Sequence, residues 1–282
     1  MLTTLTSVSG GAATVAGHDV SKDPGAVRAS IGMVPQQLIA DHELKGIENV
    51  LLFAKLHHVP NHKAKRRADE LLQLVDLQSS SEKKVKTYSG GMKRRLQLAM
   101  GLVHDPRVLF LDEPSLGLDI QTRSKMWDYV RKLNEEHGIT VFMTTHYLEE
   151  ADELCDRVAI VDGGVIKVSG SPSELKMNLG GDLLTLKVTD GQDLTRFFED
   201  IHDVKEVTKL DHSSYIIKVP RIEKVLPQIV DGIVRRDLKI SDISFTRPTL
   251  DQVFLQVTGK QIREGESEAT RTPAVPVLME EA

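Results

Sequence analysis

Two adjacent acids, Asp112 and Glu113, follow directly after residues 108–111, a run that is apolar at every position. Such a run is typical of a central parallel strand that is buried on both faces. Ligands of α/β sheets bind at the carboxyl ends of these strands, where neighbouring side chains point in opposite directions. One carboxylate could therefore hold a hydrated Mg²⁺ while the other faces an attacking water. Taken alone, the pair is more simply a solvated start of a loop.

Two more polar residues are expected at the same edge of the sheet. His146 follows residues 139–143, the next apolar run, and could contact a terminal phosphate or the attacking water. Gln36 follows a strand-like stretch, residues 31–34, and its amide oxygen could bind a metal ion or a metal-bound water. Each residue by itself is more simply a polar loop residue.

A turn made of Ser89, Gly90 and Gly91 opens a predicted helix. Backbone N–H groups at a helix N-terminus can bind an anion, and glycine lets a phosphate come close. The plainer alternative is an N-cap and a turn. We expect the basic residues 93–95 to lie on a solvated face of this helix.

Hydrophobic periodicity then places these residues in two domains. Strands alternate with helices over residues 1–179, which predicts an α/β sheet domain with a helical insert at about 38–88. Residues 182–259 follow the order β-α-β-β-α-β, which predicts a small α+β ferredoxin-like module. Residues 260–282 have no periodicity, and we expect a disordered tail.

Composition excludes some classes of protein. The chain of 282 residues has a formal net charge of -5, which gives no argument for binding nucleic acid. Its apolar runs are far shorter than the roughly 18 residues that span a bilayer. The single cysteine cannot form an internal disulfide and fits a reducing compartment.

In combination these segments resemble the nucleotide-binding subunits of ABC (ATP-binding cassette) transporters. Five motifs match in the family's order: Gln36 as the Q-loop, residues 88–92 as the signature, 108–113 as Walker B, 115–119 as the D-loop and His146 as the switch histidine. The resemblance implies a P-loop-type α/β cassette with a mixed sheet and a helical subdomain. The small α+β module, with residues 248–255 near its end, resembles the C-terminal module of daunorubicin-resistance type drug-export ATPases.

The resemblance also implies cofactors, ATP and Mg²⁺, and a second cassette packed head to tail. Site roles carry over residue by residue: Glu113 as general base, His146 as sensor of the γ-phosphate, Asp112 and Gln36 at Mg²⁺, Ser89, Gly90 and Gly91 on the partner's nucleotide, and Asp119 between the two sites. A transmembrane permease would dock near Gln36 and the helical insert. The chain would lie in the cytoplasm on the inner face of the cell membrane and power export of a drug or lipid-like substrate.

One departure from the family is severe, because no G-x-x-x-x-G-K-[ST] segment occurs in the chain. We expect the cassette to lack its first strands and its P-loop, roughly 45 residues by the usual place of that motif. The polypeptide should then bind ATP poorly and be inactive at its own site.

Two alternatives belong to other classes. A non-catalytic interaction subunit could cap a partner's ATP through its signature motif, although the chain retains Glu113 and His146. A soluble cassette protein of translation or chromosome maintenance is less consistent with the chain. Proteins of the first kind carry two cassettes, and those of the second carry a long heptad run.

Overall fold

The computed structural model describes residues 1–189 and 193–259, which fall into two compact units, Met1–Cys155 and Asp156–Ala282. The predicted domain boundary near Leu179 lies inside the second unit as the structure divides it. The tail at 260–282 that we expected to be disordered lies outside the described residues. Within the described ranges, no helix is both long enough and apolar enough to cross a membrane.

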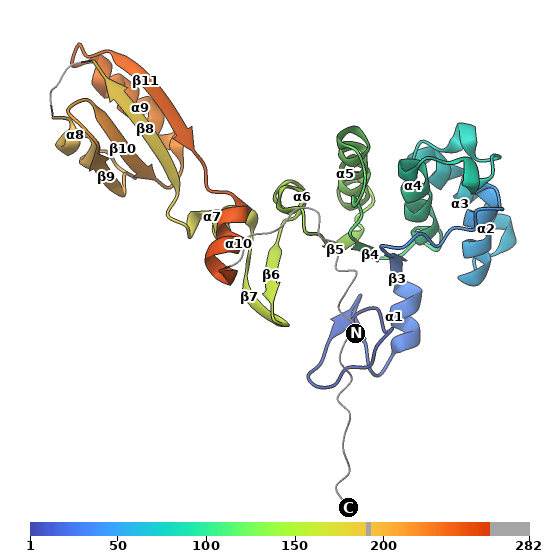
Figure 1. The fold of residues 1–282 in the computed structure, drawn as a ribbon. Coiled ribbons are helices and arrows are strands. Elements are labelled where there is room, and N and C mark those ends of the chain that lie inside the picture. The colour runs from blue at the N-terminus through green and yellow to red at the C-terminus, as the bar shows by residue number, and fades with distance from the viewer. Residues whose placement is uncertain (190–192, 260–282) are drawn as a thin grey trace, which may run out of the picture. The chain divides into compact units, whose positions relative to one another are not determined.

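The first unit is built on a parallel sheet of three strands in the order β3-β4-β5 (Figure 1). These strands are β3 (Ile31–Val34), β4 (Val108–Asp112) and β5 (Thr140–Thr144). The central position predicted for the apolar run is confirmed, because β4 pairs with both neighbours. The parallel register aligns Asp112 with Thr144, so the carboxyl ends of β4 and β5 form one edge.

Some helices of this unit pack on the sheet, and others form the predicted insert. The elements of the first unit, besides the sheet, are β1 (Thr14–Val15), β2 (His18–Asp19), α1 (Pro24–Ser30), α2 (Gly46–Leu56), α3 (Asn61–Leu74), the 3₁₀ turns η1 (Gln78–Ser80) and η2 (Val85–Thr87), α4 (Gly90–Gly101), α5 (Ile120–Glu135) and α6 (Leu148–Leu154). Helices α1, α4 and α5 pack on the sheet, and the insert consists of α2 and α3, which contact each other and α4. Its apolar stripe is buried in the core shared with α4 and β4, as helical periodicity predicts.

The two faces of the sheet differ in how well they are covered. Leu109 and Leu111 point into the main core and are almost fully buried. On the other face, Met33, Phe110 and Phe142 share one register row. Phe110 is buried, but Met33 and Phe142 are 36% and 49% exposed. This row leaves an apolar strip of the sheet open to solvent.

The second unit begins with a hairpin and contains a four-stranded antiparallel sheet in the order β11-β8-β10-β9 (Figure 1). Its elements are β6 (Val158–Asp162), β7 (Val165–Gly170), α7 (Pro172–Met177), β8 (Asp182–Val188), α8 (Thr195–Glu199), β9 (Glu206–Lys209), β10 (Ser214–Val219), α9 (Ile222–Val234), β11 (Ile240–Thr246) and α10 (Leu250–Thr258). The order β8-α8-β9-β10-α9-β11 confirms the ferredoxin-like module. Its own core includes Phe198, Tyr215 and Ile217, while α10 packs on α7 and β7.

Candidate active site

The acidic pair and the histidine meet at the carboxyl edge of the sheet. Nδ1 of His146 lies 2.8 Å from Oε2 of Glu113. The N–H of Glu113 donates to the carbonyl of Thr144 at 3.1 Å, and the Thr144 hydroxyl donates to Oδ1 of Asp112 at 2.5 Å. Glu113 also has a left-handed backbone, with φ of 50°. Strands β4 and β5 therefore hold both carboxylates and the imidazole in one hydrogen-bonded cluster.

The backbone of Gln36 is linked to this cluster through Arg94. Gln36 lies two residues beyond β3 with an exposed side chain, and its carbonyl accepts a hydrogen bond of 3.3 Å from Nη1 of Arg94. The other terminal nitrogen of the same guanidinium, Nη2, donates to the carbonyl of Asp112 at 2.7 Å. Gln36 and Asp112 thus flank one guanidinium, and both side chains are solvent-accessible. Their amide and carboxylate oxygens are of the type that Mg²⁺ prefers.

The prediction that residues 93–95 lie on a solvated helix face was wrong for Arg94. Its side chain points inward from α4, and the residue is only 8% exposed. It donates to one side-chain oxygen and five backbone carbonyls: Gln97 Oε1, Pro35, Gln36, Asp112, Glu113 and Pro114. Burial lowers the pKa of the Arg94 guanidinium, and the charges of Asp112, Glu150 and Glu113 oppose that shift. Arginine remains charged even so.

The serine–glycine turn lies at the N-terminus of α4, as predicted. The Ser89 hydroxyl accepts from the N–H of Met92 at 3.3 Å, so Ser89 is the N-cap. Ser89 and Gly90 are exposed, whereas Gly91 faces α5. A Cβ atom on Gly91 would lie only 2.4 Å from Cγ2 of Thr122. The turn and the first turn of α5 are therefore in close contact.

Asp119 holds Thr122, the residue that Gly91 contacts. Its carboxylate caps α5 by accepting from the N–H of Thr122 at 3.0 Å and from the Thr122 hydroxyl at 2.8 Å. These hydrogen bonds lower the pKa of Asp119, the backbone bond more than the side-chain bond. The signature residues therefore contact the part of α5 that Asp119 caps, whereas Glu113 belongs to a different group of hydrogen-bonded residues. Helix α4 connects the two groups, because Gly91 and Arg94 both lie on it.

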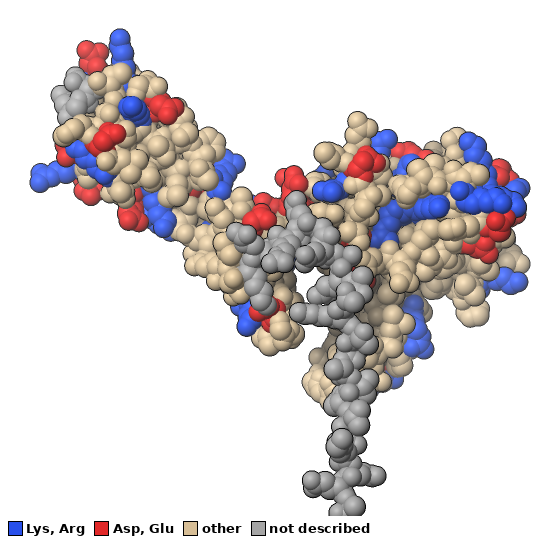
Figure 2. All heavy atoms as spheres, viewed as in Figure 1, with Lys and Arg blue, Asp and Glu red and all other residues tan. Residues whose placement is uncertain are grey.

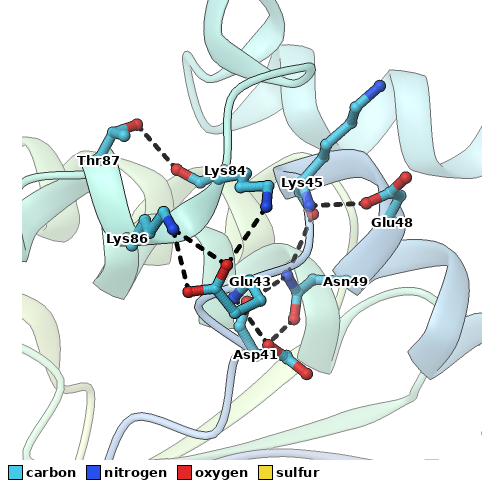
Figure 3. A network of polar contacts seen from close by, with 8 residues as sticks. All are labelled: Asp41, Glu43, Lys45, Glu48, Asn49, Lys84, Lys86 and Thr87. Carbon is cyan, nitrogen blue, oxygen red and sulfur yellow. Dashed lines mark hydrogen bonds and ion pairs between the residues drawn. The ribbon is translucent and has the colours of Figure 1, made fainter.

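A polar network ties the segment after Gln36 to the segment before Ser89 (Figure 3). Glu43 accepts from Lys84 and Lys86, and the N–H of Lys86 donates to the carbonyl of His42 at 3.0 Å. The bond from Lys86, more than that from Lys84, lowers the pKa of Glu43. Beneath them the fully buried Asn49 accepts from the Asp41 N–H at 2.7 Å. This network connects the region around Gln36 with the approach to the signature turn.

The candidate site lies at an edge of the sheet that is exposed to solvent. A groove of about 790 Å³ lies at the opposite, amino ends of β4 and β5, where Arg107, His137 and Thr140 contribute to its lining. The acidic pair is not part of that groove. On the face drawn in Figure 2, lysines and arginines gather over the α2–α4 region with acidic side chains beside them.

Comparison with known proteins identifies both parts of the chain. The family described as "ABC transporter" matches residues 1–116, and the family described as "ATP-binding protein DrrA1-3-like, C-terminal domain" matches residues 170–258. The daunorubicin resistance ATP-binding protein DrrA3 of Streptomyces coeruleorubidus is 40% identical, over 95% of this chain and 84% of that protein. The doxorubicin resistance ATP-binding protein DrrA of Mycobacterium tuberculosis is 36% identical, over 92% of this chain and 79% of that protein.

Solved structures agree with these matches. A dimeric ATP-binding cassette in a post-hydrolysis state, bound to ADP and Pi, is 26% identical with a TM-score of 0.53, over 60% of this chain and 76% of that one. The cbiO1 protein of Clostridium perfringens, part of an ABC transporter complex, is 27% identical with a TM-score of 0.56, over 62% of this chain and 71% of that one. The chain therefore belongs to the ATP-hydrolysing, ATP-binding proteins of ABC transporters, within the group related to the daunorubicin and doxorubicin resistance proteins.

Proposed function

We propose that this chain is the ATP-hydrolysing subunit of an ABC exporter and acts with a separate transmembrane permease at the inner face of the cell membrane. The observation that carries the proposal is the Glu113–His146 contact of 2.8 Å at the carboxyl edge of the parallel sheet. One similar cassette is dimeric in its solved structure, and cbiO1 is part of an ABC transporter complex. A general base next to a group that can touch the γ-phosphate is what water attack on a phosphoryl group requires.

Glu113 would accept a proton from the attacking water. Its carboxylate is held by His146, and its backbone is held by the bond from its N–H to Thr144, so the base is oriented before substrate arrives. His146 would sense the γ-phosphate with the same imidazole. Because both residues follow neighbouring strands, a shift of either strand would change their contact.

Asp112 and Gln36 would hold Mg²⁺. The ion, when bound, would neutralise charge on the phosphate oxygens. Support comes from the exposure of both side chains and from their shared anchor on Arg94.

Ser89, Gly90 and Gly91 would bind the nucleotide of a second cassette. The exposed N-terminus of α4, a helix of 12 residues, favours an anion through its unpaired N–H groups and its dipole. Asp119 would help join the two sites, because it is anchored on the residue that Gly91 packs against.

The permease would dock beside Gln36 and the helical insert at 38–88. The network of Figure 3 supports this, since it connects that region with the signature turn. The transported substrate would be a drug or a lipid-like molecule, by analogy with relatives named for resistance to daunorubicin and doxorubicin.

The polypeptide of residues 1–282, tested as it stands, should bind ATP weakly and be inactive at its own site. Residues 1–282 contain no G-x-x-x-x-G-K-[ST] segment, so this polypeptide lacks two to four charge-assisted hydrogen bonds to phosphate, at about 1.5–3 kcal/mol each. Titration with a fluorescent ATP analogue should give no saturation at low-micromolar concentrations. Low-micromolar binding would contradict this part of the proposal.

A chimera tests the function itself. The N-terminal segment of a complete cassette of the family, including its G-x-x-x-x-G-K-[ST] loop, is joined to residue 1. The chimera should hydrolyse MgATP, and hydrolysis should disappear in the His146→Ala variant. A non-catalytic role, in which the signature turn only caps a partner's ATP, predicts that the chimera binds ATP without hydrolysing it.

A further inference from the structure

We propose that Arg94 is a positioning residue that couples the signature helix to both the catalytic carboxylate and the Q-loop. This inference rests on the proposed function, because it takes Glu113 as the base and Ser89 to Gly91 as the partner's contact. Arg94 lies within the second turn of α4, the helix that those residues begin. Backbone carbonyl groups surround its guanidinium.

Three consecutive carbonyls of the Walker B turn converge on Arg94. Nη2 donates to the carbonyls of Asp112 and Glu113, each at 2.7 Å, and Nε donates to that of Pro114 at 2.9 Å. Successive carbonyls of an extended strand point in opposite directions. They can converge here because Glu113 has φ of 50°, a conformation that is uncommon outside glycine. The guanidinium therefore stabilises the backbone conformation from which the Glu113 carboxylate projects.

A second set of consecutive carbonyls comes from the Q-loop. Nη1 of Arg94 donates to the carbonyl of Pro35 at 2.7 Å and to that of Gln36 at 3.3 Å. The next carbonyl, of Gln37, accepts from Nε2 of Gln97 at 2.7 Å, and Oε1 of Gln97 accepts from Arg94 at 3.2 Å. Arg94 and Gln97 thus act as one unit that binds residues 35–37 on one side and residues 112–114 on the other.

Because the site is buried, only an arginine at position 94 can satisfy all these carbonyls. Arg94 and Gln97 are 8% and 2% exposed, so water cannot readily replace a lost donor. The negative charges that offset the buried cation include Glu150, which is fully buried and accepts from the Trp127 indole at 3.0 Å. A lysine ammonium has three donors on a flexible stem and cannot reproduce the planar fork.

A movement of α4 would consequently change the geometry of both loops. When the signature turn engages a nucleotide held by the other cassette, the helix transmits any shift to the carbonyls on either side of Glu113 and to the backbone of Gln36. Hydrolysis in one site would then respond to the occupancy of the other. Arg94 touches no substrate in this scheme and acts through Glu113 and Gln36.

The first test uses the 282-residue chain without nucleotide. Amide hydrogen exchange is measured by mass spectrometry in the wild type, in Arg94→Lys and in Arg94→Met. Peptides that cover residues 34–38 and 111–116 should exchange at least about tenfold faster in both variants, because the hydrogen bonds that close these loops are lost. The matched control is Arg95→Met, which removes bonds to the carbonyls of Val75 and Asp76 instead. Unchanged exchange in both loops of Arg94→Lys would overturn the proposal.

The second test uses the chimera with the phosphate-binding loop. Arg94→Lys should lower kcat by about tenfold or more and leave KM for ATP within about twofold, since the base is misplaced while binding contacts remain. Arg95→Met should change neither constant by more than about twofold. A rise in KM with unchanged kcat, or equal effects of the two arginines, would overturn the positioning role. If no chimera hydrolyses ATP, the proposed function fails, and the exchange experiment still decides whether Arg94 couples the two loops.

Discussion

Neighbouring residues fix both the backbone conformation and the side-chain orientation of Glu113. Its carboxylate contacts His146, its N–H bonds to Thr144, and its carbonyl bonds to Arg94. A left-handed backbone at a non-glycine residue costs roughly 1–3 kcal/mol and persists where the surroundings enforce it. Such strain is common at functional sites, which is consistent with a catalytic role for this residue.

Gly91 should be intolerant of any side chain. Gly91→Ala would place a methyl group 2.4 Å from Cγ2 of Thr122, a β-branched residue that Asp119 holds in place. We expect the substitution to lower the free energy of unfolding by about 1–3 kcal/mol, as measured by urea denaturation. Thr122→Ser removes Cγ2 and keeps the hydroxyl, so it should restore most of the loss in the double variant.

Gly90→Ala is the matched control for this prediction. A Cβ at Gly90 meets nothing within 4 Å, and alanine is a better helix former than glycine. We therefore expect Gly90→Ala to be neutral or slightly stabilising. Equal destabilisation by the two alanines would show that contact with Thr122 is not the reason for glycine at position 91.

The sequence predicts the types of residue at the site better than their contacts. Asp112, Glu113, His146 and Ser89 lie at or just beyond the strand ends and the helix N-terminus where the sequence predicts them, because local patterns determine those ends. The role of Arg94 is not predicted, since a run of three basic residues is usually solvated. One signal was available: Arg94, Gln97 and Gly101 are spaced i, i+3 and i+7, which places them on one helix face.

That helix face lies against the sheet because of two glycines. A Cβ on Gly32 of β3 would lie 2.2 Å from the carbonyl oxygen of Gly101, and a Cβ on Gly101 would lie 3.0 Å from the Val34 side chain. The close approach brings Arg94 within reach of the carbonyls that follow β3. Sequence spacing alone could not reveal this approach, because it depends on which helix packs on which strand.

At the scale of elements, the open face of the β3-β4-β5 sheet should bind a hydrophobic dye. Phe142 is 49% exposed and contacts Phe110 with ring centroids 5.3 Å apart. Phe142→Thr should reduce ANS fluorescence and aggregation on heating, at a cost of about 1 kcal/mol for the lost aromatic pair. Ile120→Thr removes an apolar residue that is 83% exposed on α5 and serves as the control. Equal loss of ANS signal in both variants would contradict a binding strip on the sheet.

A stacked pair of histidines, His57 directly after α2 and His104 in the turn after α4, should make stability depend on pH. The His104 imidazole stacks on that of His57 with centroids 3.8 Å apart, and its Nε2 donates to the carbonyl of Ile31 at 2.8 Å. Burial lowers the pKa of His104 from its ordinary value of 6.5, an effect that outweighs the bond to Ile31. The folded state therefore binds fewer protons here than the unfolded state, so this contribution is present above about pH 6.5 and is lost as the pH falls.

Melting temperatures at pH 7.5 and pH 5.5 test this dependence. The wild type should melt lower at the acidic pH, and His104→Gln should show a smaller difference between the two. His62→Gln, which changes an exposed histidine of α3, should keep the wild-type difference. A difference that is unchanged in His104→Gln would exclude His104 as the source.

At the scale of the whole molecule, the two units should unfold separately. Among the residues that the structure describes, the main cores of the two units have no residue in common: Leu109 belongs to the first, and Ile217 belongs to the second. Both side chains are fully buried, so replacement by alanine should cost about 2–5 kcal/mol in the unit that contains it. Differential scanning calorimetry should show that Ile217→Ala lowers one transition and Leu109→Ala lowers the other. A single transition shifted by both variants would contradict this independence.

The architecture follows from the sequence more completely in the second unit than in the first. Alternation of residue types over 183–188 predicts a strand with one covered face, the burial pattern of β8 agrees, and the β-α-β-β-α-β order then leaves few arrangements. The first unit also contains β2 and α1, which periodicity did not predict, because a two-residue strand and a seven-residue helix carry too few apolar positions.

The proposed function depends on Glu113 acting as the base of an ATP-hydrolysing site. Its most direct test is the single-turnover rate of ATP hydrolysis in the chimera that carries a phosphate-binding loop, measured for Glu113→Gln and for Glu149→Gln, an exposed glutamate of α6. Glu113→Gln should slow hydrolysis by about 10²–10⁴-fold with ATP binding retained, as expected for loss of a general base, and Glu149→Gln should leave the rate unchanged. A Glu113→Gln chimera that hydrolyses ATP as fast as its parent would contradict the claim.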